Sequence, residues 1–129
     1  MSSNAMARTP AFEAMLSRIR TICTGLPEVA EEVDGHGHTV FRGNGKTFIF
    51  TGDHNLEQTP GLSVKTDKEN QELLIASGKY TKTPYIGQHG WVSIHGEPDW
   101  DELADLVEES YLRVAPKKLA KQVQNVTRP

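Results

Sequence analysis

The residues of this chain most suited to chemistry are its histidines, of which there are five. His36 and His38 lie two positions apart, so on an extended strand both rings would leave the same face, as two metal ligands do. A zinc site takes four protein ligands, or three plus water, and no Cys-x-x-Cys or His-Glu-x-x-His run supplies the others. We therefore interpret the histidines as solvated turn residues and expect no metal and no cofactor.

Basic side chains are the second group that could do chemistry, because they bind phosphates. Between Glu97 and Glu109 lie seven acids and no base, whereas Tyr111–Pro129 carries bases and no acid. The alternative interpretation is a solvated surface whose bases suit the end of a helix. The candidate nucleic-acid-binding residues are Arg42, Lys46, Lys65, Lys117, Lys118 and Lys121.

The third candidate is the segment Thr83–Gly90, which is rich in glycine and carries Pro84. Long, turn-rich loops of this kind often carry function, and an exposed aromatic residue in one could line a pocket. A strand that opens with a tryptophan follows directly. We expect this loop to border a ligand pocket, and the candidate ligand-binding residues are Lys65, Tyr85, His89 and Trp91.

Catalytic motifs are not found in the sequence. The glycines form neither a G-x-G-x-x-G run nor a phosphate loop, and the serines occur without a nucleophile elbow. The dense acids of the last helix are explained by a solvated face and by a favourable position near a helix N-terminus. We therefore assign no catalytic residue and expect a non-enzymatic protein.

The elements that must position these residues follow from periodicity. Apolar residues recur at helical spacing over 9–24 and 99–114, with Thr9 and Asp99 as capping residues. Two β-runs, 39–42 and 46–50, flank Gly43-Asn44-Gly45, which predicts a hairpin with a three-residue loop. Further strands are predicted at 62–65 and 91–94, with a short one at 31–34.

Three finer expectations concern the middle of the chain. Phe48 and Phe50 should share one face of their strand, because side chains alternate with a period of two. Thr66 and Glu69 match a capping box, which predicts a helix that ends at Gly78. Lys79–Gly90 is predicted to be a long loop.

The order of elements predicts the fold class. Strands follow one another directly, which favours hairpins over parallel crossovers. We predict an α+β, two-layer fold, an antiparallel β-sheet with helices packed on one face, including Trp100 in the buried stripe of the last helix. One domain should span residues 9–122, with 1–8 as a tag remnant or a disordered segment and 123–129 as a basic tail.

Bulk composition limits the class of protein. The chain has 129 residues, 36% of them apolar and 24% charged, which suits one soluble globular domain. The formal net charge of −3 disfavours a dedicated DNA binder and leaves only a local patch. The single cysteine, Cys23, fits a reducing cytoplasm and the core of a helix. No signal peptide or membrane span is predicted.

Three pieces of the chain carry a family resemblance. Leu62–Thr66 runs into a helix with Leu73-Leu74, Pro84-Tyr85-Ile86 precedes Gly90-Trp91-Val92, and Leu103, Leu106 and Val107 lead to Ser110-Tyr111. In this order and spacing they resemble the MmcQ/YjbR family of small bacterial proteins. The resemblance implies a compact double-wing fold, similar to that of CyaY, and a DNA-binding role of the kind often proposed for members.

Three interpretations of function follow, the last of which is an unrecognised enzyme. The first is a non-enzymatic protein that binds DNA through a local basic patch. The alternative is a small-molecule or protein-binding module that uses the Tyr85–Trp91 loop. The sequence leaves open the ligand, the DNA sequence and the oligomeric state.

Overall fold

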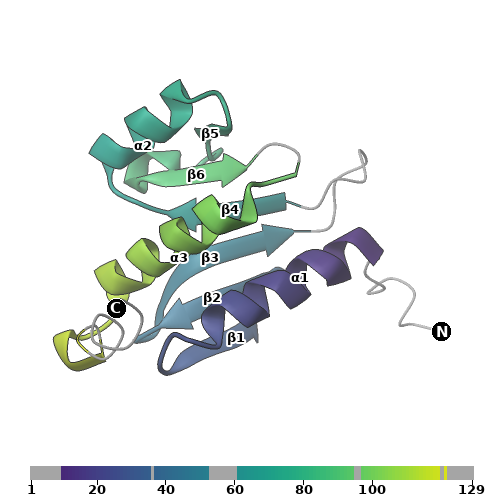
Figure 1. Cartoon of the computed structure of the whole chain (residues 1–129), viewed down its shortest axis with the longest axis vertical. Coiled ribbons are helices and arrows are strands. Elements are labelled where there is room, and N and C mark those ends of the chain that lie inside the picture. Colours follow the sequence, from purple (N-terminus) through teal and green to yellow (C-terminus); the bar gives the residue numbers. More distant parts are fainter. Residues whose placement is uncertain (1–9, 36, 53–60, 95–96, 120, 122–129) are drawn as a thin grey trace.

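The computed structural model describes residues 10–35, 37–52, 61–94, 97–119 and 121 of the chain. Its centre is a six-stranded antiparallel sheet with the strand order β1-β2-β3-β4-β6-β5 (Figure 1). The α+β class predicted from the sequence is thereby confirmed. The elements are α1 Pro10–Cys23, β1 Val29–Val33, β2 Thr39–Gly43, β3 Lys46–Gly52, β4 Gly61–Lys65, α2 Lys68–Ala76, β5 Tyr80–Lys82, the 3-10 turn η2 Gly87–His89, β6 Trp91–Ile94 and α3 Trp100–Val114.

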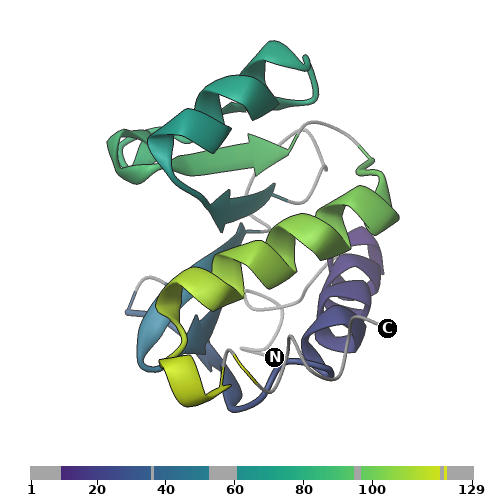
Figure 2. The same cartoon turned by 60° about the vertical axis from the view of Figure 1, so that its left-hand side comes forward.

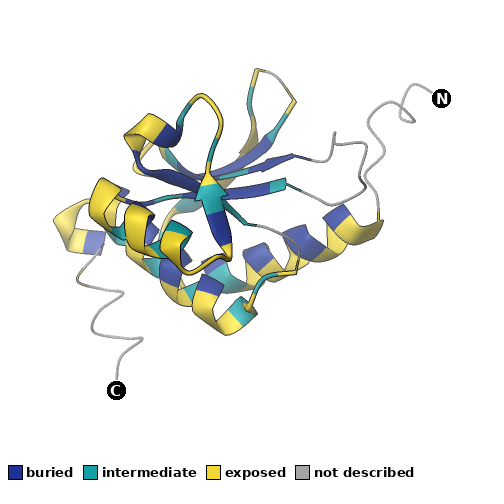
Figure 3. Ribbon diagram, turned by 90° about the horizontal axis from the view of Figure 1, so that it is seen from above, coloured by how far each residue is buried: buried dark blue, intermediate teal, exposed yellow. Residues whose placement is uncertain are grey.

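The two long helices form the second layer. α1 and α3 cross the same face of the sheet, and α3 contacts β3 and β4 (Figure 1). α2 packs on β5 and β6 at one edge of the sheet (Figure 2). The buried residues of the long helices point towards the strands, and the exposed ones lie on the outer side (Figure 3). We call the face covered by α1 and α3 the helix face, and the other the open face.

The core confirms the predicted helical stripes. Phe12, Leu16 and Ile19 of α1 are buried against one side of the sheet, and so are Leu103 and Tyr111 of α3. Trp100, by contrast, is only half-buried: it packs against the edge of the core, and its ring centroid lies 4.8 Å from the guanidinium carbon of Arg18.

The β2–β3 hairpin is tighter than predicted. β2 extends to Gly43, so the loop consists of two residues, Asn44 and Gly45, with φ of 56° and 75°. Two successive positive φ values are typical of a type I′ turn, which matches the twist of the flanking strands. Gly43 is part of the strand and pairs with Lys46. A Cβ at this position would lie 3.2–3.3 Å from Val114 and Tyr111, so only glycine fits under α3 without displacement.

A β-bulge overturns the expectation that Phe48 and Phe50 share a face. Phe41 pairs with Ile49 and Arg42 with Thr47, so Phe48 is an extra residue on β3. Phe48 and Ile49 consequently both belong to the core on the helix face and are fully buried. Phe50 lies outside that core, with its ring centroid 4.6 Å from that of His38.

The start of α2 also differs from the prediction. Asp67 is the N-cap, because its Oδ1 accepts a hydrogen bond of 2.8 Å from the backbone nitrogen of Asn70. Thr66 instead prolongs β4, with its backbone nitrogen donating to the carbonyl oxygen of Gly90 at 2.9 Å. The capping box was thus displaced by one residue, because continued strand pairing takes Thr66. The helix ends at Gly78 as predicted, where φ is 87°.

The segment Lys79–Gly90 is not a simple loop. Tyr80–Lys82 forms the edge strand β5, which pairs antiparallel with β6, and Gly87–His89 forms η2. Tyr and Thr favour strands, but a run of three residues is too short to signal one in the sequence.

Some predictions concern residues outside the described part of the chain. These are the cap Thr9, the tag remnant 1–8, the basic tail 123–129, and His36, His54 and His95. Within the residues that the structure does describe, no helix combines the length and the apolar run needed to cross a membrane.

Cys23 supplies a test of the core. It is buried on α1, and this burial, followed by the nearby charge of Glu31, raises the pKa of its thiol to about 12. In the unfolded chain the thiol ionises near pH 9, so the unfolded state loses its proton first as the pH rises. The stability contributed is complete below pH 9 and is lost towards pH 12. We expect the free energy of unfolding of wild type to fall more steeply over this window than that of Cys23→Ala, as measured by urea titrations at several pH values; parallel slopes would contradict a buried thiol.

Candidate functional site

A cross-strand pair on the open face holds two of the predicted ligand-binding residues together. Lys65 at the end of β4 pairs with Trp91 at the start of β6. The Lys65 Nζ lies 5.9 Å from the centre of the indole ring, near the outer limit of a cation–π contact. The same nitrogen donates to the carbonyl oxygen of His89 at 2.9 Å, so it links the strand to the turn before β6. Lys65, the backbone of His89 and the buried ring of Trp91 therefore form one cluster.

Close packing of backbone at Gly90 makes this cluster possible. Gly90 has φ of 97°, a left-handed conformation that favours glycine. A Cβ at this position would lie 2.0 Å from the carbonyl oxygen of Thr66. Only glycine lets β6 begin so close to the end of β4.

Gln71 is a positioning residue that the sequence analysis missed. Its side chain is buried, and Nε2 donates to the carbonyl oxygens of Gly87 at 2.7 Å and of Trp91 at 2.9 Å. Gln71 thus fastens α2 to the start of η2 and to the first residue of β6. An isolated glutamine near a helix start usually faces solvent, so nothing in the sequence distinguished this one.

Tyr85, the fourth candidate ligand-binding residue, lies apart from the cluster. Its side chain is 96% exposed, at the tip of the turn between β5 and η2. It therefore lines no enclosed cavity.

Arg42 lies at the same end of the sheet as Lys65. Its guanidinium donates from Nε to the Thr47 hydroxyl at 3.0 Å and from Nη1 to Glu32 at 2.8 Å. Since Phe41 belongs to the helix face, Arg42 belongs to the open face, as Lys65 does. An incoming anion would compete with Glu32 for this guanidinium.

The remaining candidate bases approach this end from the helix face. Lys46 pairs with Gly43, which lies against Val114 at the end of α3. The turn after α3 is packed on the domain, because Leu119 is buried, and it leaves Lys117 and Lys118 exposed. β2 ends, β3 begins, β4 ends and α3 ends on the left-hand side of Figure 1. We call this the basic end, made of Arg42, Lys46, Lys65, Lys117, Lys118 and Lys121.

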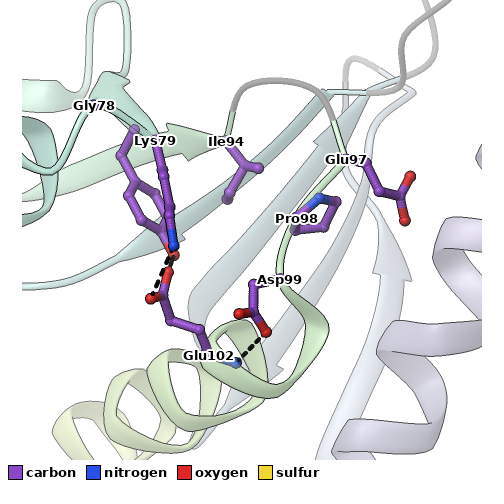
Figure 4. A pocket seen from close by; sticks show the side chains of 8 residues that line it. Gly78, Lys79, Ile94, Glu97, Pro98, Asp99 and Glu102 are labelled. Atoms are coloured by element: carbon purple, nitrogen blue, oxygen red, sulfur yellow. Dashed lines mark hydrogen bonds and ion pairs between the residues drawn. The ribbon is translucent and has the colours of Figure 1, made fainter.

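A pocket of about 540 Å³ lies between the α2–β5 turn and the start of α3 (Figure 4). Tyr80 and Lys79 converge there on Glu102, with contacts of 2.9 Å from the hydroxyl and 3.5 Å from the amine. Burial, then the hydrogen bond to Glu102, raises the pKa of Tyr80. None of the four candidate ligand-binding residues lines this pocket, and its carboxylates are unsuited to a phosphate.

Metal chemistry finds no support among the described residues, where no three His, Cys, Asp or Glu side chains gather to hold an ion. His38, the described member of the His36–His38 pair, has its Nδ1 3.5 Å from the Asp34 carboxylate, and its ring packs on Phe50.

A family model described as YjbR matches residues 24–113, which include the Lys65–Trp91 pair and all of α2. The chain belongs to the YjbR family. The predicted resemblance is thus confirmed, and the Lys65–Trp91 cluster lies within the YjbR-matching part. Lys117, Lys118 and Lys121 follow it.

A solved structure shares the YjbR fold. The crystal structure of Deinococcus radiodurans protein DR2400, assigned to the domain DUF419, superposes with a TM-score of 0.67 and covers 92% of each chain. The two sequences are 23% identical, so the similarity shows the fold alone. No curated protein matches the chain.

Proposed function

We propose that this YjbR-family chain is a non-enzymatic protein that binds DNA phosphates through its basic end. What supports the proposal is that the elements carrying the six bases, from Arg42 to Lys121, have their ends at one end of the sheet (Figure 1). Four of them, Lys46, Lys117, Lys118 and Lys121, are exposed. The acidic stretch Glu97–Glu109 begins at the opposite end, where α3 starts.

Phosphate contacts rather than base contacts would supply the affinity. α3 carries five acids and a single base, so it would be repelled from a DNA groove. With a net charge of −3, long-range attraction is absent and binding depends on the local patch. We therefore expect weak association that disappears as salt is raised.

A matched pair of double variants tests this. Lys117→Gln/Lys118→Gln removes two bases of the basic end, and should weaken binding on all sequences alike and flatten the log–log salt dependence by up to about 2 units. The control, Arg18→Gln/Lys79→Gln, changes the net charge equally but removes bases near the start of α3, where Arg18 stacks on Trp100 and Lys79 pairs with Glu102. Fluorescence anisotropy of a labelled duplex, titrated from about 50 mM salt upwards, measures both.

Two results would overturn the proposal. One is no association of the wild type even near 50 mM salt, where phosphate contacts are strongest. The other is an equal effect of the two double variants, which would make the effect one of net charge alone.

The second candidate function is a small-molecule or protein-binding module that uses the Tyr85–Trp91 loop. The hydrogen bond from the buried Gln71 to the Gly87 carbonyl oxygen favours it, because this bond holds the loop against α2. Absence of DNA binding in the assay above would promote it to the leading function.

A further inference from the structure

Tyr85 is held in an unusual backbone conformation. Its φ is 69°, and the backbone nitrogen of Ile86 donates to the carbonyl oxygen of Pro84 at 2.7 Å. A bond across two residues around a positive φ is a γ-turn of the rare, strained kind. A bulky residue is costly at such a position, and persists only where the surroundings fix it.

The surroundings of this turn do fix it. The backbone nitrogen of Gly87 donates to the carbonyl oxygen of Thr83 at 2.8 Å, which closes the turn. The buried Gln71 then holds the Gly87 carbonyl oxygen from α2 at 2.7 Å. The turn is therefore fastened on both sides of Tyr85, and its ring is presented to solvent by a rigid support. The backbone that carries the ring is thus in place before a ligand arrives, which reduces the conformational entropy lost on binding.

The surface beside the ring suits a polyanion. β4, β5, β6 and the turn 83–90 contain no aspartate or glutamate. Three hydroxyls lie in a row on the open face, with the buried Ser63 2.9 Å from Ser93 and Ser93 3.0 Å from Thr83, and the last two are partly exposed. Hydroxyl groups and lysines are common partners of the sugar–phosphate backbone.

A line of residues leads from the basic end to the turn. Thr83 donates its backbone nitrogen to the carbonyl oxygen of Trp91 at 3.3 Å, and Trp91 pairs with Lys65. Arg42 lies at this end of the same face, two strands beyond Lys65. Tyr85 follows Thr83 by two residues. A chain of phosphates over Arg42 and Lys65 would thus run towards the turn that carries Tyr85.

We propose that Tyr85 is a stacking platform for an unpaired base, so that the chain prefers single-stranded over duplex DNA. The proposal rests on the proposed function, since the basic end supplies the phosphate contacts. A free aromatic face can stack on an unpaired base, whereas the bases of a duplex already cover one another. A ring that is 96% exposed cannot enclose a small ligand, which normally loses most of its surface to a pocket. A protein hot spot would lie within a desolvated apolar patch, whereas this ring is almost fully exposed.

The experiment compares a labelled oligo(dT) strand with a duplex of equal length at about 50 mM salt, a concentration at which phosphate contacts remain strong. The variants are Tyr85→Ala, which removes the ring, and Tyr85→Phe, which keeps its face and loses only the hydroxyl. The positive φ at this position costs alanine about as much as tyrosine, and the Tyr85 side chain is exposed. Neither change should therefore alter the melting temperature appreciably. Lys117→Gln/Lys118→Gln is the phosphate-contact control.

We expect the wild type to bind the single strand more tightly than the duplex. Tyr85→Ala should weaken single-strand binding about 5- to 100-fold, the loss typical of one stacked base, and leave duplex binding unchanged. Tyr85→Phe should bind like the wild type. The lysine variant should weaken both ligands.

Each opposite result has a definite meaning. Equal affinity for the two ligands, or a Tyr85→Ala variant that binds the single strand like the wild type, overturns the stacking proposal while the salt-dependent duplex binding upholds the basic end. A loss in Tyr85→Phe as large as in Tyr85→Ala assigns the effect to the hydroxyl and also overturns stacking. No binding of either ligand by the wild type overturns both proposals, and leaves the ring for a protein partner.

Discussion

Replacing Gly90 with alanine should destabilise the domain by more than about 3 kcal/mol, a loss at the upper end of what single substitutions cause. Two causes act together at this residue. Its φ of 97° is unfavourable for any side chain, and an added Cβ would lie 2.0 Å from the carbonyl oxygen of Thr66. The clash is with backbone, so it can be relieved only by separating β4 from β6, whose pairing holds β5 in the sheet.

Gly78→Ala is the matched control. Gly78 has a similar φ of 87°, but nothing lies within 4 Å of a Cβ built there. It should therefore show the cost of conformation alone, about 1–2 kcal/mol. Chemical denaturation of the two variants separates the terms. An equal loss in both would mean that the two strands yield easily at Gly90, and that the close approach does not constrain the site.

The sequence predicted the large elements of this fold because their signals are local. α1 and α3 repeat their apolar residues over four turns, and the glycines of the β2–β3 hairpin mark a turn by themselves. Such patterns need no knowledge of what lies opposite in space.

The errors share the opposite cause, since each was decided by a partner remote in the chain. Gly43 belongs to β2 because it pairs with Lys46, and it is a glycine because α3 passes close over it. Phe48 is turned into the core by a bulge, which depends on how β2 registers against β3. Thr66 pairs with Gly90 through a backbone hydrogen bond, so Asp67 is the N-cap of α2. Propensity and period carry no information on such contacts.

The candidate site was predicted as residue types rather than as a geometry. The sequence identified Lys65, His89 and Trp91, which the structure brings together, but grouped Tyr85 with them as though all four lined one pocket. The exposure of Tyr85 and its strained turn depend on bonds from Gln71, which no motif announces. The sequence predicts a local basic patch, but its place at one end of the sheet depends on where β2, β4 and α3 end, which no motif specifies.

Replacing Trp91 with alanine should cost about 3–5 kcal/mol, the usual loss for a large buried aromatic side chain. Trp91 is 7% exposed although it lies on the open face, outside the core that packs under the helices. Its ring therefore contributes a separate apolar contact, bounded on one side by Lys65. Its removal would leave a void beside the β4–β6 pair that neighbouring strands cannot readily fill.

Trp100→Ala provides the comparison on the helix side. Trp100 is only half-buried, donates from Nε1 to Glu97 at 2.8 Å and lies under Arg18, so its loss should cost about 1–2 kcal/mol. Urea unfolding followed by far-ultraviolet circular dichroism avoids dependence on tryptophan fluorescence in either variant. A loss below about 1 kcal/mol for Trp91→Ala, or a smaller loss than for Trp100→Ala, would show that the open face contributes little to stability. The line of residues from Arg42 through Lys65 to Thr83 would then lack the rigid support that the proposed stacking site needs, because Trp91 lies between Lys65 and Thr83.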